Sequence, residues 1–400
     1  MSDADVGQKA SRHLGERHRP SGLNSCFTPT RAIFPEYIRS SRDMIAQARC
    51  GQTGVGLEQI IEGNSPFELY PEAGAGKEHP YRRGILLVHG LSDSPYFMRH
   101  LATIFCQNGF RVMAVLLPGH GTRPGDLLEV SWQEWLKTVE YGIEQLDKEV
   151  DEVYLGGYSA GGALSVYQSG RDERVRGLFL FAPALKISPR AAFAAFHKSY
   201  SWLMPTAKWL VIKPDNDHYK YESFPKNAAA QMYALTRMVQ KQITASKLRI
   251  PVFAVVSQDD ATVNTPAIVQ FIQDLPHDSS KLLYLYSNPE RTPRGLPTGR
   301  LESLDSRFPD LGIVSAAHTA IVLPREDGYY GEQGIYRNCL HYYPDAMSQY
   351  ETCQRSTLPV KQGEITDQLL KSGLMRRLMF NPNFSAMEAA IRRFIAALPS

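Results

Sequence analysis

A serine with a glycine two positions away on each side stands at residue 159. Gly157, Ser159 and Gly161 have the spacing Gly-x-Ser-x-Gly. Residues 153–155 before them are typical of a short strand, and residues 162–166 after them of the start of a helix. On such a strand-to-helix turn the serine hydroxyl is held clear of the backbone, and the glycines let the turn close. The pattern predicts that Ser159 is a nucleophile; the alternative is a glycine-rich loop with a chance serine.

A serine hydroxyl needs a neighbouring base, and the base needs a carboxylate to orient it. Five histidines follow Ser159 in the chain, namely His197, His218, His277, His318 and His341. His318 is the best candidate because it follows a strand-like run at 311–314 and three small residues at 315–317. The other four fall in a helical insertion, a polar turn or a tyrosine-rich segment.

Two adjacent aspartates are candidates for the orienting carboxylate. Asp259 and Asp260 follow the apolar run at 251–256, which reads as a strand. Adjacent side chains point in different directions, so only one of the two is expected to reach His318. Either aspartate could instead cap the helix that begins near Pro266.

Main-chain amides near the nucleophile could stabilise negative charge on a substrate oxygen. The amide of Ala160 falls at the start of the predicted helix, where N–H groups lack partners and the helix dipole favours negative charge. The loop after the strand that ends at His89 would supply a second donor, the amide of Leu91. His89 itself is expected to shape this loop, and His120 to pack within its own.

Strand-like and helical patterns alternate along most of the chain. Apolar runs typical of buried strands occupy residues 84–89, 111–117, 153–155, 175–181, 251–256 and 281–286, with a short edge strand at 66–70. Helical spacing is found at 35–49, 96–107, 132–146, 161–168, 266–275 and 385–398. This alternation predicts an α/β fold with a mostly parallel sheet and helices on both faces. Ligands of such sheets bind at the carboxyl ends of the strands, where the candidate residues fall.

Residues 1–25 are polar and are expected to be disordered, and residues 26–400 are expected to form one domain. Residues 185–247 are helical and aromatic, and predict a cap insertion in which Trp202 and Trp209 contact substrate. The alternative is that these aromatic residues form the insertion's own core. Residues from about 287 to 312, rich in proline, arginine and glycine, indicate a further insertion.

Charge and composition argue against several other functions. The 44 lysine and arginine residues nearly balance 41 aspartate and glutamate residues, without the basic patch of a nucleic-acid-binding protein. No apolar run approaches the ~18 residues of a membrane span and no secretory signal is evident, so we expect a cytoplasmic protein. No metal or nucleotide motif is present, so neither a metal nor a cofactor is expected. The five cysteines read as ordinary thiols, although Cys339 and Cys353 are near enough in sequence to form a bridge.

From about residue 84 to residue 318 the chain resembles the α/β-hydrolase superfamily, in particular bacterial carboxylesterases and monoacylglycerol lipases, often labelled serine aminopeptidase S33-like. The motifs that carry the resemblance are Leu86-Leu87-Val88-His89-Gly90, Pro118-Gly119-His120-Gly121, Gly157-Tyr158-Ser159-Ala160-Gly161, Gln258-Asp259-Asp260 with Val263-Asn264, and Ala317-His318. In such esterases an aliphatic residue, here Val263, follows the triad acid by three positions, which selects Asp260. The resemblance also implies that the insertion at 185–247 covers an acyl pocket.

The resemblance implies hydrolysis of a small carboxylic ester, such as a monoglyceride or a short acyl ester, through a triad of Ser159, His318 and Asp260 and an acyl-enzyme. A thioesterase, acyltransferase or amidase would use the same triad. A hydrolase-fold binding protein without turnover is a further alternative. Two features depart from the family: the spacing from Asp260 to His318 is longer than usual, and the tyrosine-rich segment at 329–357 has no counterpart. The sequence does not indicate an oligomeric state.

Overall fold

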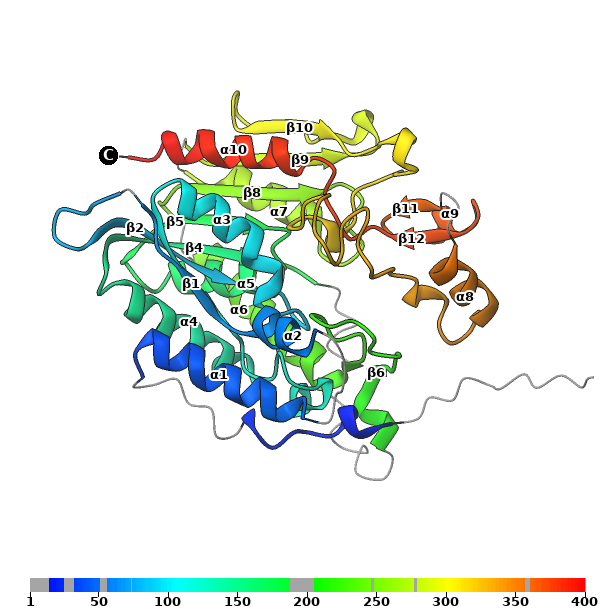
Figure 1. Cartoon of the computed structure of the whole chain (residues 1–400). Helices are drawn as coiled ribbons and strands as arrows, with labels where there is room; N and C mark the ends of the chain where they lie inside the picture. Colours follow the sequence, from blue (N-terminus) through cyan, green and yellow to red (C-terminus); the bar gives the residue numbers. More distant parts are fainter. Residues whose placement is uncertain are drawn as a thin grey trace, which may run out of the picture.

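An eight-stranded sheet forms the centre of the molecule (Figure 1). The computed structural model describes residues 14–24, 32–50, 56–72, 74–187, 205–245, 248–276, 279–356 and 360–399. The strands lie in the order β1-β3-β2-β4-β5-β8-β9-β10. Their bounds are β1 Phe67–Leu69, β2 Tyr81–Val88, β3 Phe110–Val115, β4 Val150–Tyr158, β5 Val175–Phe181, β8 Val252–Ser257, β9 Lys281–Tyr286 and β10 Leu301–Asp305. Only the edge strand β1 runs antiparallel to its neighbour, so the expected mostly parallel sheet is confirmed.

Helices cover both faces of the sheet, which explains why the central strands are apolar and buried toward their carboxyl ends. On one face, the ring of Phe179 in β5 packs against Phe105 of α3 at 4.7 Å and against Phe394 of α10 at 5.3 Å. On the other face α4 approaches β2 so closely that a Cβ on its Gly142 would lie 2.6 Å from the side chain of Leu86. The bounds of these helices are α3 Arg99–Gln107, α4 Trp132–Leu146 and α10 Phe384–Ala396.

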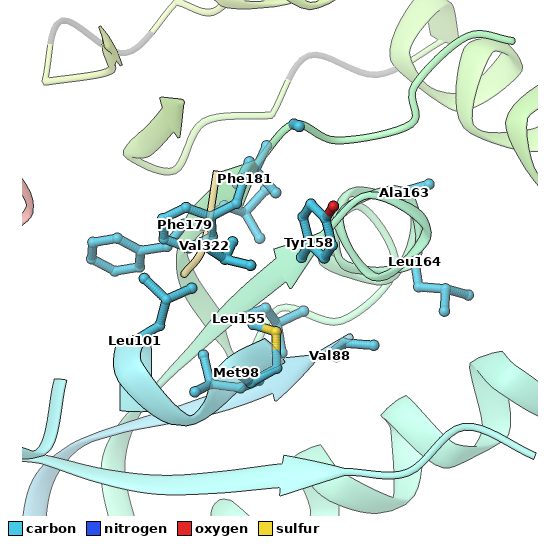
Figure 2. Packing of buried hydrophobic residues seen from close by; sticks show 14 of the residues in the cluster. Val88, Met98, Leu101, Leu155, Tyr158, Ala163, Leu164, Phe179, Phe181 and Val322 are labelled. Atoms are coloured by element: carbon cyan, nitrogen blue, oxygen red, sulfur yellow. The ribbon is translucent and has the colours of Figure 1, made fainter. Parts of the chain in front are cut away.

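The turn at Ser159, at the end of β4, rests on this core. Figure 2 shows Tyr158 at the end of β4 among buried side chains that include Met98, Leu155 and Phe181. Helix α5, Ala160–Ser169, follows the turn at once, and every residue from Ala160 to Gln168 is buried. A serine placed between the buried end of a strand and a helix that is buried from Ala160 to Gln168 has little freedom to move.

The remaining helices lie near the edges of the sheet or follow its later strands. Their bounds are α1 Phe34–Ala48, α2 Leu57–Asn64, α6 Lys226–Ala245, α7 Thr265–Asp274, α8 Met347–Arg355 and α9 Asp367–Leu370. Helices α1, α3, α4, α5, α7 and α10 confirm the expected ones within a few residues, whereas α2, α6, α8 and α9 were not expected as separate helices. None of the helices in the described ranges is long and apolar enough to cross a lipid bilayer.

The expected insertion at 287–312 is partly wrong, because it contains the last strand of the sheet. Leu301–Asp305 form β10, which pairs in parallel with β9 along five residues. Its residues are only half buried, as befits an edge strand, so no apolar run marked it. The strand expected at 311–314 is absent: Gly312 has a left-handed φ of 67°, and the backbone there makes only isolated bridges through Ile313.

The expectation of disorder up to residue 25 does not hold for residues 14–24. Asp126 accepts hydrogen bonds from the amide and hydroxyl of Ser21 at 2.6 and 2.8 Å, and Asn24 accepts one from the amide of Gly119 at 3.0 Å. A short 3₁₀ turn, Glu16–His18, carries the buried ring of His18. Hydrogen bonds of polar side chains therefore hold this stretch in place, and no apolar pattern in the sequence indicates it. Residues 1–13 and 25–31 lie outside the described ranges.

The described part of the expected cap, residues 205–245, contains a small hairpin and the long helix α6. The hairpin strands are β6 Trp209–Val211 and β7 Phe224–Pro225. Helix α6 packs against α5, the helix that follows Ser159. Residues 188–204 of the expected cap lie outside the description.

A disulfide-bridged unit fills the chain between His318 and α10. It contains α8, α9 and the parallel pair β11 Lys361–Gly363 and β12 Met375–Arg377. Figure 1 shows it as the orange and red lobe beside the carboxyl ends of the strands. Cys339 and Cys353 are bonded in this unit, so the preference for ordinary thiols was wrong for these two, although Cys50 and Cys106 are free. No pattern other than their nearness in sequence marked the pair.

Candidate active site

The turn at Ser159 has the strained geometry that the sequence pattern predicts. Ser159 has φ 53° and ψ −112°, a left-handed φ that non-glycine residues rarely adopt. A Cβ on Gly157 would lie 2.4 Å from the backbone of Gly161, and a Cβ on Gly161 would lie 2.0 Å from the carbonyl oxygen of Val88. Both glycines are therefore required for the backbone to pass at these points.

The structure brings Ser159, His318 and Asp260 together from three distant parts of the chain. The Nε2 atom of His318 lies 3.0 Å from the Oγ atom of Ser159, and its Nδ1 atom lies 2.6 Å from Oδ2 of Asp260. A carboxylate can only accept, so Nδ1–H donates to Asp260 and the lone pair of Nε2 faces the serine hydroxyl. This is the tautomer in which the imidazole can take a proton from Ser159.

The carboxylate of Asp260 is held in place and kept ionised. Its side chain is fully buried, and its Oδ1 atom accepts hydrogen bonds from the amides of Thr262 and Val263 at 2.8 and 2.9 Å. Burial alone raises the pKa of Asp260. The electrostatic attraction of the His318 ring, its hydrogen bond and the two amides outweigh burial, so the pKa of Asp260 is lowered.

Asp259, the other candidate acid, contacts a different partner. Its Oδ1 atom accepts a hydrogen bond from the hydroxyl of Ser287 at 3.0 Å, and burial raises its pKa. Only Asp260 of the two aspartates is brought to His318. The sequence alone left this choice open until the position of Val263 was considered.

The loop that carries the expected second amide lies directly beside the nucleophile. A Cβ on Gly90 would be 3.2 Å from the Cβ of Ser159. Within the described part of the chain, neither the amide of Leu91 nor that of Ala160 donates a hydrogen bond. Two amides without partners next to a serine hydroxyl could both donate to an oxyanion.

His89 and His120 connect this loop to the loop after β3. The Nε2 atom of His89 accepts a hydrogen bond from the amide of Leu117 at 3.0 Å, and its Nδ1 atom donates to the carbonyl of Gly90 at 2.8 Å. His120 accepts from the amide of Ser92 at 3.1 Å. Burial lowers the pKa of His120 to about 4 and that of His89 well below its ordinary value, so both rings are neutral. Their contacts agree with the loop-shaping role expected from the sequence.

The two tryptophans expected to contact substrate are not brought to the three residues. Trp202 lies outside the described residues. Trp209, in β6, is 6% exposed, and its ring packs edge-on against the ring of His18 at 4.9 Å. His18 lies outside the insertion, so this contact supports neither alternative, and contact between Trp209 and substrate stays a prediction.

Three further residues contact His318 or support its contacts and were not found from the sequence. The hydroxyl of Tyr158 donates to the carbonyl of His318 at 3.1 Å. Glu364 accepts from the amide of His318 at 3.0 Å and pairs with Arg377 at 3.0 Å. Tyr158 occupies a variable position of the serine motif, and the other two lie in a segment without a recognised pattern.

The chain is similar to known proteins in sequence and in fold. The sequence model of the family described as serine aminopeptidase, S33 matches residues 79–288, which is more than half of the chain. The chain belongs to this family. This S33-family hydrolase contains Ser159 and Asp260 within the matched region, whereas His318, Glu364 and Arg377 follow it. Its sheet and nucleophile turn are those of the α/β-hydrolase fold.

Two curated relatives of the S33-family hydrolase are bacterial. It is 26% identical over 230 residues to a thermostable monoacylglycerol lipase of Bacillus sp. (strain H-257), a match that covers 57% of this chain and 88% of the relative. It is 21% identical over 208 residues to a carboxylesterase of Bacillus subtilis (strain 168), a match that covers 50% of this chain and 81% of the relative. A solved structure of metagenome-derived lipolytic enzymes aligns with a TM-score of 0.47 and 25% identity, covering 56% of this chain and 89% of that chain.

Proposed function

We propose that this S33-family hydrolase is a serine esterase that cleaves carboxylic esters through Ser159, His318 and Asp260. The observation that carries the proposal is the continuous contact of 3.0 Å from Ser159 Oγ to His318 Nε2 and of 2.6 Å from His318 Nδ1 to Asp260. An imidazole between a hydroxyl and a buried carboxylate can move a proton in both directions during acyl transfer.

The reaction has two halves. In the first, Ser159 Oγ attacks the ester carbonyl, and its proton passes to Nε2 of His318. The carbonyl oxygen becomes an oxyanion to which the amides of Leu91 and Ala160 donate. The intermediate collapses, the C–O bond to the alcohol breaks, and the alcohol leaves with the proton from His318. In the second half, water gives a proton to His318 and attacks the acyl-enzyme, which releases the acid and restores Ser159.

The proposed substrate is a monoglyceride or another small acyl ester. The printed names of the two Bacillus relatives, a monoacylglycerol lipase and a carboxylesterase, support this class. The chemistry needs no metal or cofactor, because proton transfer and oxyanion stabilisation come from side chains and amides of the chain itself. Acyl-chain length would depend on the residues that cover Ser159.

Amide hydrolysis is the second candidate, and the family name favours it. The S33 family is described by an aminopeptidase activity, and the same three residues would open an amide or a thioester by the same two steps. An amide differs in needing a proton on the leaving nitrogen before the bond breaks. His318 would supply it.

Initial rates on a matched panel of substrates test the proposal. The panel contains p-nitrophenyl esters of increasing chain length, a monoglyceride, an acyl-CoA and a peptide anilide, each with the wild type and with Ser159→Ala. We expect turnover of esters that is lost in the variant. Turnover of the anilide or the thioester alone would replace the ester proposal, and binding of the panel without any turnover would favour a binding protein.

A further inference from the structure

His318 is followed by some fifty residues of chain that return to it with a buried carboxylate. Glu364 comes directly after β11 and is 1% exposed. Its Oε2 atom accepts a hydrogen bond from the main-chain amide of His318 at 3.0 Å. The main chain of His318 is therefore hydrogen-bonded to a residue that lies beyond the region matched by the family.

The same carboxylate also reaches the loop that carries Asp260. The amide of Ala261 lies 3.5 Å from Oε2 of Glu364. Arg377, from β12, pairs with Glu364 at 3.0 Å and donates a hydrogen bond to the hydroxyl of Thr262 at 2.9 Å. The amide of Thr262 binds the carboxylate of Asp260. The pair of Glu364 and Arg377 therefore contacts both the loop that carries His318 and the loop that carries Asp260.

Further contacts fix Glu364 against the histidine loop. The amide of Glu364 donates to the hydroxyl of Ser315 at 3.0 Å, and the amide of Val314 donates to the carbonyl of Gln362 at 2.9 Å. A Cβ on Gly363 would lie 2.7 Å from the hydroxyl of Ser315. The backbone of β11 is thus packed directly on the stretch that leads into His318.

Glu364 and Arg377 balance each other's charge. A buried carboxylate is costly unless it is paired and hydrogen-bonded, and Glu364 has Arg377 and the amides of His318 and Ile365 at its oxygens. Burial lowers the pKa of Arg377, but the charge of Glu364 and its hydrogen bond outweigh this and raise the pKa, which keeps the guanidinium charged. Removing Arg377 would leave the carboxylate of Glu364 buried and without its charged partner.

We propose that Glu364 is a positioning residue for the catalytic histidine, with Arg377 holding it between the loops of His318 and Asp260. This inference rests on the proposed function, since it assigns a role within the same site. It also gives the disulfide-bridged unit, which the sequence comparison did not place, a part in the reaction. The side chain of Arg376 binds the carbonyl of Cys353 at 2.7 Å and so attaches β12 to the bridged region.

The test compares two buried carboxylates of the same C-terminal region. Asp327 is 4% exposed and is bonded by the amides of Tyr329 and Tyr330 and by His100, without contact to Ser159, His318 or Asp260. Glu364→Ala and Asp327→Ala both remove a buried acceptor, so both are expected to lower the thermal midpoint. Only Glu364→Ala is expected to lower kcat, by about 10- to 100-fold with KM within about twofold, because small displacements of a catalytic group are that costly.

Two conservative variants keep the test decisive if Glu364→Ala does not fold. Glu364→Gln retains an acceptor for the amide of His318 and is expected to recover most of the kcat that alanine loses. Arg377→Lys keeps the charge but loses the fork that spans Glu364 and Thr262, and is expected to lower kcat without raising KM. The inference is overturned if folded Glu364→Ala keeps wild-type kcat, if Arg377→Lys keeps it where Glu364→Ala does not fold, or if Asp327→Ala loses kcat equally.

The wild type and Ser159→Ala separate this result from the proposed function. If the wild type hydrolyses esters and Ser159→Ala does not, the proposed function stands whatever Glu364 does. If the wild type fails on every ester, the proposed function fails, and the inference fails with it because there is then no esterase histidine to position.

Discussion

The hydroxyl of Tyr158 donates a hydrogen bond to the carbonyl oxygen of His318 at 3.1 Å, although the two residues are 160 positions apart. The two rings are also stacked, with centroids 5.3 Å apart. Tyr158 directly precedes Ser159, so one peptide segment carries the proposed nucleophile and holds the backbone of the proposed base. Glu364 binds the amide of the same histidine, which fixes its main chain from both sides.

Tyr158→Phe tests this contact because it removes the hydroxyl and keeps the ring. We expect a loss of about 1 kcal/mol in the free energy of unfolding, the usual value for one buried hydrogen bond. We also expect a several-fold lower kcat, since the carbonyl of His318 would lose its partner. Urea unfolding and ester kinetics measure the two effects. A variant with wild-type kcat would show that the histidine is held sufficiently by its other contacts.

The choice between the adjacent aspartates leads to a paired prediction. Asp260→Asn should lower kcat by about 10³- to 10⁴-fold, because an amide at this position favours the wrong histidine tautomer. Asp259→Asn should stay near the wild type, since Asp259 contacts Ser287 and not His318. Both variants are measured on the same p-nitrophenyl ester. An equal loss in the two, or a larger one in Asp259→Asn, would reassign the acid.

Acidification should weaken the fold through His89 and His120. Both pKa values are lowered by burial, so the unfolded chain binds more protons than the folded chain below the ordinary histidine value of about 6.5. Stability is therefore retained above this pH and falls as the pH drops toward about 4, where His120 itself becomes protonated. Full protonation of His120 in the unfolded chain alone would cost up to about 3 kcal/mol.

Urea unfolding between pH 7 and pH 4 measures this dependence. His120→Gln keeps an acceptor for the amide of Ser92. It should make the slope of the free energy of unfolding against pH shallower by the equivalent of about one proton. Wild type and variant with the same slope would mean that proton uptake in this range comes from other groups.

The bond between Cys339 and Cys353 should contribute to stability. The two cysteines are 14 positions apart, and a loop of this size commonly yields about 2–4 kcal/mol. The double variant Cys339→Ser/Cys353→Ser should lose this amount of the free energy of unfolding, measured in urea. A reductant should lower the free energy of unfolding of the wild type but not that of the variant. Peptide mapping without reduction should recover the linked pair. Unlinked peptides from the native protein would contradict the bridge.

The parts of the site that could be predicted are those with a local signature. The turn at Ser159 follows from two glycines between a strand and a helix, and His318 from its place after small residues. The apolar run at 251–256 indicates an acid at Asp259 or Asp260, and the resemblance selects Asp260 through Val263. Each of these signals spans a few neighbouring residues. The structure then adds distance and direction, which distinguish Asp260 from Asp259.

The parts that could not be predicted depend on contacts across long stretches of chain. Glu364 acts through its distance to His318, and nothing around it in the sequence differs from an ordinary surface glutamate. Strand β10, Leu301–Asp305, is half buried and lacks the apolar run of an interior strand. The disordered start was expected because residues 14–24 are polar, yet Ser21 binds Asp126 by two hydrogen bonds.

Covalent labelling with a fluorophosphonate, followed by peptide mass spectrometry, tests the central claim most directly. The account predicts a single adduct on Ser159 in the wild type and labelling of His318→Ala that is slower by several orders of magnitude, because the serine then lacks its base. No adduct on folded wild-type protein, an adduct on another residue, or equally fast labelling of His318→Ala would contradict it.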